Sequence, residues 1–162
     1  MAELPNPAAA LQARFHAIHH GAMQGLPMLN PALHVRALGF RHWQGHWLGV
    51  LLTPWFMNLV LMPRRPELWP GIGERETRHY VFPAGVFEFI GAHDAELGDY
   101  QACSLFSPMF EFADQAGAQA TALAALEALF DAGNVPSTAP MPAQRNKREF
   151  MFGANRQGGH GP

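Results

Sequence analysis

The feature that most constrains the fold is an apolar run of 17 residues, Trp47 to Pro63, that contains no charged side chain. A membrane-spanning helix needs about 20 consecutive apolar residues, so this run is at the lower limit of length. Pro54 lies at its centre, where it would break a helix, and Thr53-Pro54 is typical of a turn. The run therefore predicts two buried antiparallel strands, at residues 46–53 and 58–63, and no membrane span.

An N-terminal helix is predicted from a start signal and from periodic apolar residues. Asn6-Pro7 combines a helix-capping residue with a proline suited to the first helical position. Apolar residues then recur at helical spacing, at positions 8, 11, 15, 18 and 22. Gly25 and Pro27 are expected to end this helix.

A second helix is predicted between residues 113 and 131, where alanine and leucine dominate. Ser107-Pro108 offers a start signal before it, and Gly133 is expected to close it. Three large apolar residues are predicted to share one face of this helix: Leu123, Leu126 and Phe130.

Segments of strand length lie between the two helices, at residues 33–40, 46–53, 58–63, 79–83, 85–92 and 100–106. The predicted fold class is α+β, a mainly antiparallel sheet of five to six strands flanked by an N-terminal and a C-terminal helix. A length of 162 residues suits one domain, expected at residues 1–133. Residues 134–162 are predicted to be a proline-rich linker and a basic, flexible tail.

Charge is distributed unevenly along the chain. Residues 1–142 carry a balance of −5, whereas residues 143–162 carry +3, and no Lys or Arg occurs between His79 and Gln144. An acidic body repels a phosphate backbone, so nucleic acid is excluded as an expected partner. A basic peptide would be attracted to this region, although a solvated acidic surface that only aids solubility is the alternative.

Sequence patterns for catalysis or for a cofactor are missing from the chain. Its single cysteine, Cys103, excludes an intramolecular disulfide and an all-cysteine metal cage. His16 and His20 are spaced as two ligands on a helix would be, but their segment offers no acidic or cysteine partner. We therefore predict no enzyme, no metal and no cofactor. A catalytic dyad formed by Cys103 across the fold remains the alternative to a buried, inert thiol.

Consecutive large apolar residues indicate a binding surface. Trp55, Phe56 and Met57 cannot all face one core, so at least one is expected to reach the surface. The segment 105–112 raises the same issue, and burial of all these side chains within the monomer is the alternative. The predicted partner-binding residues are these aromatic and methionine side chains and the carboxylates near them: Trp55, Phe56, Met57, Glu88, Phe106, Met109, Phe110, Glu111 and Asp114.

The tail contains the string NKREFMFG, which resembles the twin-arginine export motif. Lys147 and Arg148 take the place of the arginine pair, and Phe150 and Met151 take the place of Phe-Leu. The motif lies at the wrong end of the chain and is followed by polar residues, so it does not address this protein for export. We interpret it as an imitation of a ligand that the body of the protein binds, with a chance match as the alternative.

Several long strings resemble the HybE/HupJ/HoxT family of [NiFe]-hydrogenase assembly chaperones. They include MQGLPMLNPALHVRALGF, HWLGVLLTPWFMNLVLMP, FPAGVFEFIG, LGDYQACSLFSPMFEFADQ and KREFMFG, and the resemblance spans about residues 11–153. Some relatives carry a rubredoxin-like module with paired CxxC motifs. This chain has one cysteine, so no iron site is carried over.

The resemblance implies a cytoplasmic accessory protein without catalytic residues. It implies binding of the small-subunit precursor, which has a twin-arginine signal, before export, and in some members action on the large subunit or with other maturation proteins. The acids beside phenylalanines would suit such a signal, and we expect the tail to occupy this site until a client displaces it. A metal- or redox-handling protein that protects hydrogenase during assembly in oxygen, through the histidines or Cys103, is the alternative.

Overall fold

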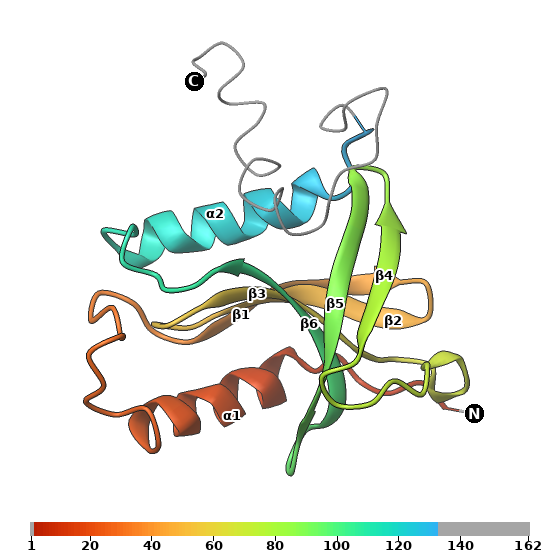
Figure 1. Ribbon diagram of the computed structural model, residues 1–162, viewed down its shortest axis with the longest axis horizontal. Coiled ribbons are helices and arrows are strands. Elements are labelled where there is room, and N and C mark those ends of the chain that lie inside the picture. The colour runs from red at the N-terminus through yellow and green to blue at the C-terminus, as the bar shows by residue number, and fades with distance from the viewer. Residues whose placement is uncertain (1, 133–162) are drawn as a thin grey trace.

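A six-stranded antiparallel sheet lies between two helices in the computed structural model, which describes residues 2–132. Figure 1 shows α2 (Gln115–Ala128) above the sheet and α1 (Ala8–His20) below it. The strand order is β1-β2-β3-β6-β5-β4. The strands are β1 (Arg36–Trp43), β2 (His46–Leu52), β3 (Met57–Pro63), β4 (Thr77–Phe82), β5 (Gly85–Asp94) and β6 (Gly98–Phe106), and a 3₁₀ turn, η1 (Pro66–Leu68), follows β3. The predicted α+β class is confirmed, whereas the linker and tail at 134–162 lie outside the described residues.

The apolar run forms two central strands, as predicted. β2 and β3 pair from His46↔Pro63 to Leu52↔Met57, and nearly every residue in them is buried. A strand covered on both faces needs apolar residues at every position, which explains why the run does not alternate. Neither helix in residues 2–132 has the length and apolar character needed to cross a membrane.

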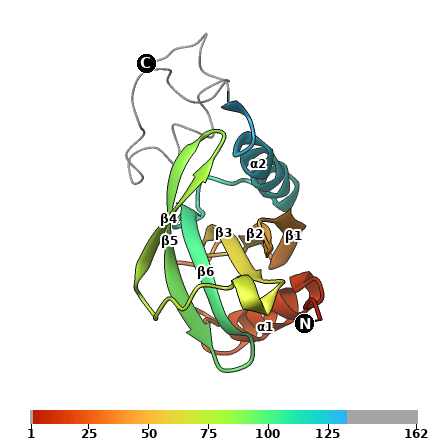
Figure 2. The same cartoon turned by 90° about the vertical axis from the view of Figure 1, so that its right-hand side faces the viewer.

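Each face of the sheet has its own core. Leu126 of α2 belongs to the larger cluster, which takes Val50 and Leu52 from β2. Phe15 of α1 belongs to the smaller cluster, which takes Leu51 from the same strand. Figure 2 looks along β1, β2 and β3 and shows the two helices on opposite sides of these strands.

The helix boundaries differ from the predicted ones. α1 ends at His20, before Gly25, and Asn6 contributes a hydrogen bond in which its Oδ1 accepts from the N–H of Ala8 at 2.9 Å. Ser107-Pro108 does not start α2; that peptide bond is cis, and the helix begins at Gln115.

Asp114 is the residue that starts α2, because its Oδ1 accepts a 2.8 Å hydrogen bond from the N–H of Gly117. The predicted apolar face was also partly wrong, since Leu126 is buried but Leu123 is 44% exposed.

The β4–β5 hairpin diverges from the rest of the sheet. β5 pairs with β6 only from Ile90↔Ala102 to Asp94↔Gly98, so its first half pairs with β4 alone. The tip of the hairpin meets the C-terminal end of α2, where the N–H of Ala84 donates to the carbonyl of Leu129 at 3.0 Å. This contact fixes the hairpin at the end of the molecule where the described chain stops (Figure 1).

Candidate functional site

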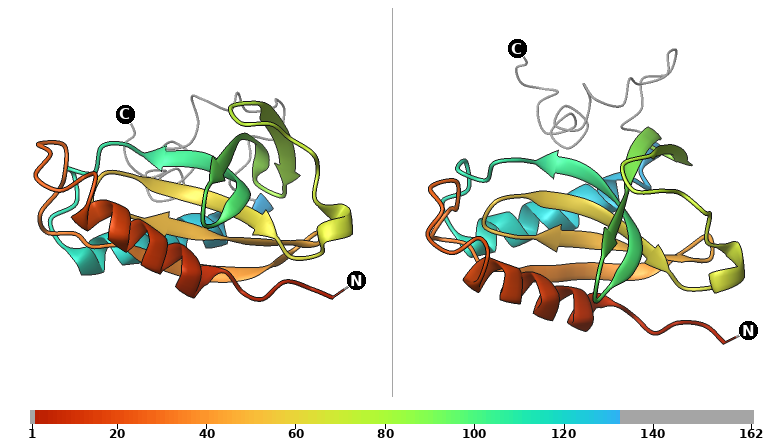
Figure 3. Two further views of the ribbon diagram at one scale, coloured as in Figure 1. Left: turned by 90° about the horizontal axis from the view of Figure 1, so that it is seen from below. Right: turned by 60° about the horizontal axis from the view of Figure 1, so that its bottom comes forward.

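Three loops meet at the end of the sheet where β3 begins and β6 ends (Figure 3). Asn30 joins them through hydrogen bonds. Asn30 is 7% exposed, and its N–H donates to the carbonyl of Pro54 at 2.9 Å. Its Nδ2 donates to the carbonyls of Met109 and Phe112 at 3.0 and 2.9 Å, while Oδ1 accepts from the N–H of Ala32. The backbone and side chain of one buried residue thus connect the α1–β1, β2–β3 and β6–α2 loops.

Exposed apolar side chains gather on the loops that Asn30 joins. Leu26 and Met28 precede it in the α1–β1 loop and are 38% and 45% exposed, and Phe110 of the β6–α2 loop is 56% exposed. Glu111, beside Phe110, is exposed too. We call Leu26, Met28, Phe110 and Glu111 the loop-end surface. An exposed apolar group of this kind, with a charged residue at its margin, is typical of a protein-binding site.

Only part of the predicted binding set is accessible there. Phe110 and Glu111 are exposed, and Trp55 and Phe56 are half-buried. The Phe56 ring packs edge-on against Phe15 of α1, with centroids 5.9 Å apart. These two aromatic residues therefore border the smaller core cluster.

Three members of the predicted set are core residues and cannot contact a partner directly in this conformation. Met57, Phe106 and Met109 are each at most 1% exposed and belong to the larger cluster. Met57 pairs with Phe106 across β3 and β6, and α2 covers that face of the sheet. The sequence could not reveal this cover, because it depends on a helix more than fifty residues after Met57.

The predicted acidic residues do not converge. Asp114 and Glu111 lie before α2, whereas Glu88 lies on the β4–β5 hairpin, whose tip contacts the other end of the helix. A helix of 14 residues is about 21 Å long, which separates the two places. Glu88 faces His79 instead, with Oε2 and Nε2 3.9 Å apart.

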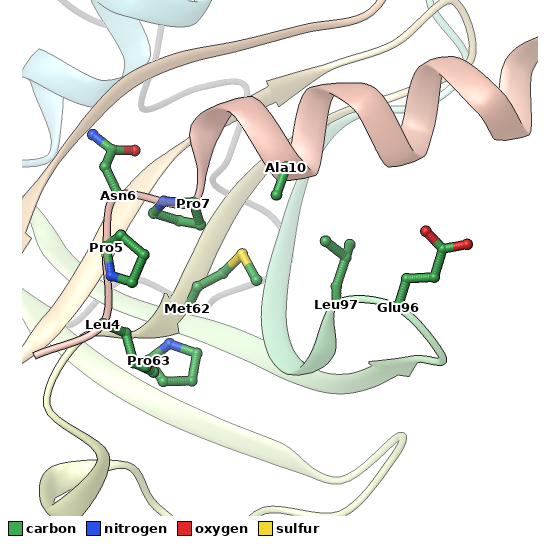
Figure 4. A pocket seen from close by; sticks show the side chains of 9 residues that line it. All are labelled: Leu4, Pro5, Asn6, Pro7, Ala10, Met62, Pro63, Glu96 and Leu97. Atoms are coloured by element: carbon green, nitrogen blue, oxygen red, sulfur yellow. The ribbon is translucent and has the colours of Figure 1, made fainter.

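A small groove lies beside the N-terminal arm, between α1, the end of β3 and the β5–β6 turn (Figure 4). Its volume is about 240 Å³, and Glu96 is its single charged residue. The lining residues are Leu4, Pro5, Asn6, Pro7, Ala10, Met62, Pro63, Glu96 and Leu97. Ligand sites usually measure about 300–1,000 Å³, so the groove is small for a cofactor and suits one or two apolar side chains.

The histidines and Cys103 do not assemble a reactive centre within residues 2–132. His16, His19 and His20 stack loosely at the end of α1, and burial followed by the charges of His20 and His16 lowers the pKa of His19. No three His, Cys, Asp or Glu side chains in this part of the chain are grouped to hold a metal ion. Cys103 is 1% exposed.

Asn30, Leu26 and Met28 are functional candidates that sequence reasoning missed. The string MLNPAL offered one signal, a single asparagine among apolar residues just before a proline. Leu26 and Met28 lie among and just after the residues expected to end the first helix, Gly25 and Pro27, and their exposure follows only from how the loops are joined.

Comparisons with known proteins agree with the resemblance in the sequence. The family model described as "[NiFe]-hydrogenase assembly, chaperone, HybE" matches residues 6–153. Protein HoxT of Cupriavidus necator is 39% identical over 90% of this chain and 88% of its own length. The probable rubredoxin HupJ of Rhodobacter capsulatus is 41% identical over 80% of this chain, but the chain spans only 47% of HupJ.

The fold has a solved counterpart in the solution structure of HybE from Escherichia coli. The two chains superpose with a TM-score of 0.61 and share 26% sequence identity over 90% of this chain and 92% of HybE. The family match, the relatives and the shared fold agree. The chain therefore belongs to the HybE family of [NiFe]-hydrogenase assembly chaperones.

Proposed function

We propose that the protein is a cytoplasmic, non-catalytic chaperone that binds the precursor of a hydrogenase small subunit through the loop-end surface before export. The observation that carries the proposal is the exposure of Leu26, Met28 and Phe110 on loops held by a buried asparagine. A chaperone that receives incompletely folded clients needs apolar surface that its own fold leaves uncovered. Hydrogen bonds from Asn30 keep that surface in one shape, so little order is lost on binding.

Charge supports a basic client. The balance of −5 over residues 1–142 attracts positively charged segments, and the exposed Glu111 follows the exposed Phe110 in the β6–α2 loop. A twin-arginine signal presents two guanidinium groups followed by apolar residues, which matches a carboxylate followed by apolar surface. Hydrogen bonds between guanidinium and carboxylate groups are among the stronger polar contacts in proteins.

The test measures binding of the full chain to a small-subunit precursor, a copy with both signal arginines changed to glutamine, and the mature subunit. We expect Phe110→Ser to weaken precursor binding by about 10-fold or more, as for a central apolar contact. Leu68→Ser is the matched control, because Leu68 is 49% exposed but lies near Gly45, at the opposite end of the sheet. We expect less than about a 2-fold change for this variant.

Different outcomes test the two parts of the proposal, the loop-end surface and the signal that it binds. Equal affinity of Phe110→Ser and the unchanged chain would remove the loop-end surface from the proposal. Equal binding of the glutamine copy and of the mature subunit would move recognition from the signal to the folded subunit. Within residues 2–132 no comparable observation favours the metal- or redox-handling alternative.

A further inference from the structure

β4 is an edge strand whose outer side is open to a further strand. It is the last strand in the sheet order, and its register with β5 runs without a shift from Thr77↔Ile90 to Phe82↔Gly85. Every second residue of such a strand directs its N–H and C=O away from its neighbour. An uninterrupted edge of this kind is a template for strand addition.

The opposite edge of the sheet, strand β1, is irregular and is partly covered by α2, unlike β4. β1 shifts register between Leu38 and Arg41, and Gly39 in that interval has a φ of +69°. Irregularities of this kind bend an edge away from pairing. The side chains of Leu123 and Leu126 from α2 also approach Gly39. β4 has no such interruption.

The face of β4 and β5 that points away from α2 carries two exposed large apolar residues. Val81 is 72% exposed and Ile90 is 47% exposed, the highest and the fourth highest values among the exposed large apolar residues of the described chain. Between them, His79 and Glu88 pair across the two strands. An added strand would therefore meet two apolar positions and one carboxylate on this face.

The described chain ends beside this edge. Phe130 packs against Phe82, the last residue of β4, with ring centroids 5.9 Å apart, and the described residues stop at position 132. The 14 residues 133–146 can extend to about 45 Å, and β4 is about 20 Å long. A segment that follows them can therefore reach every position along β4. The shortest path enters at the C-terminal end of β4, beside Phe130, and a segment that enters there runs antiparallel to β4.

We propose that residues 146–152 of this chain add to the edge of β4 as an antiparallel strand. The segment alternates in the way the edge requires, because Arg148, Phe150 and Phe152 fall on one face and Lys147, Glu149 and Met151 on the other. The basic charge of this segment complements the acidic body, and its aromatic side chains cover the exposed apolar face of the hairpin.

Charge selects one register. With Glu149 opposite Arg78, the acidic side chain of the segment lies beside an exposed guanidinium, which sits 5.8 Å over the ring of Tyr80. The same register places Arg148 in line with the His79–Glu88 pair. It also places Phe150 in line with Thr77 and its partner Ile90. Opposite charges across neighbouring strands stabilise pairing, and like charges oppose it.

Backbone hydrogen exchange in the full chain tests the proposal. We expect Phe150→Ser to speed exchange of the outward-facing β4 amides by about 5-fold or more, with the amides of β1 unchanged as an internal control for folding. Arg78→Glu should do the same, and the double variant R78E/E149R should restore slow exchange. Unchanged hydrogen exchange of β4 in Phe150→Ser would overturn the proposal. If the double variant R78E/E149R did not restore slow hydrogen exchange, the proposed register would be wrong.

A disulfide cross-link tests whether the strand added to β4 comes from the same chain or from another copy. In the proposed register Asn146 lies opposite Val81, so V81C/N146C should form a disulfide within one chain under mild oxidation, at least about 5-fold faster than L123C/N146C. Leu123 is the matched control because it is also an exposed apolar side chain, on α2, nine residues before the end of the described chain. Equal rates for the two pairs, or disulfides that join two chains, would overturn addition within the chain; the second result would assign the edge to another copy.

Discussion

Arg14 of α1 and Asp94 at the end of β5 form an ion pair across 80 positions of sequence, with Nε 3.0 Å from both carboxylate oxygens. The same carboxylate accepts hydrogen bonds from the N–H groups of Glu96 and Leu97, at 2.9 and 3.0 Å. The pair thereby joins the first helix to the β5–β6 turn. Burial alone would raise the pKa of Asp94, but the two N–H groups and Arg14 hold it below its ordinary value of 3.8.

Asp94→Asn should lower the free energy of unfolding by about 1–2 kcal/mol at pH 7, since the pair is only partly shielded from water. A carboxyl whose pKa is lowered by folding stabilises the fold at pH values above its pKa in the unfolded chain. This stabilisation is lost as the pH falls through the pKa of the folded state. The difference between the two proteins should therefore shrink at about pH 3. Urea unfolding at both pH values measures it.

Glu127→Gln is the matched control for this ion pair. Glu127 contacts Arg41 at 3.1 Å, but its side chain is 73% exposed. We expect a change below about 0.5 kcal/mol, as for an exposed pair. If Glu127→Gln and Asp94→Asn lowered the free energy of unfolding equally, the position of Asp94 between α1 and the β5–β6 turn would add no stability beyond that of an exposed ion pair.

The ring of Phe40 on β1 occupies the space beside Gly49 of β2, because a Cβ at Gly49 would overlap with that ring. Gly49→Ala should destabilise the fold by about 1–3 kcal/mol through overpacking. Gly71→Ala is the matched control, since nothing lies within 4 Å of a Cβ built there. Thermal unfolding compares the two, and an unchanged midpoint for Gly49→Ala would show that Phe40 moves aside freely.

Much of the fold could be predicted from local patterns. Pro54 divides an apolar run that is too short for a membrane helix, and the result is the β2–β3 pair. Other features depend on contacts between distant segments. The strand order places β6 between β3 and β5, although β4 follows β3 in the sequence, and no local pattern specifies that insertion.

The candidate site was harder to predict than the fold. Trp55, Phe56 and Met57 were expected to divide between the core and the surface, and Met57 is fully buried while the other two are half-buried. Period-2 alternation assigns side chains to faces, but whether a face is covered depends on α1 and α2. Phe110 could be found from sequence because its neighbours are also large and apolar, whereas Met28 could not.

Asn30 should be indispensable for the loop-end surface. Asn30→Asp keeps the shape but replaces the donating amide with a carboxylate that faces the carbonyls of Met109 and Phe112. We expect a loss of about 2–3 kcal/mol in the free energy of unfolding, because buried acceptors lose their donors. Urea unfolding measures the loss, and hydrogen exchange of the β6–α2 loop should speed up. Asn6→Ala is the control: Asn6 makes a similar 2.9 Å bond to Ala8 but is exposed, so the expected loss is below about 1 kcal/mol.

His93 and His46 should titrate on opposite sides of the ordinary histidine value of 6.5. A 2.7 Å hydrogen bond from Nδ1 of His93 to Asp99, and then the charges of nearby carboxylates, raise the pKa of His93. Burial first, and then Arg64 and Arg78, lower the pKa of His46. Because the folded pKa of His93 is raised, its stabilising contact is complete below pH 6.5 and is lost as the pH rises through the folded value. Proton NMR titration of the histidine ring signals gives both values in one experiment. Asp99→Asn should return His93 toward 6.5 and leave His46 in place, and a high value for His93 that persists in this variant would assign the shift to the other nearby acids, Glu74 and Asp94.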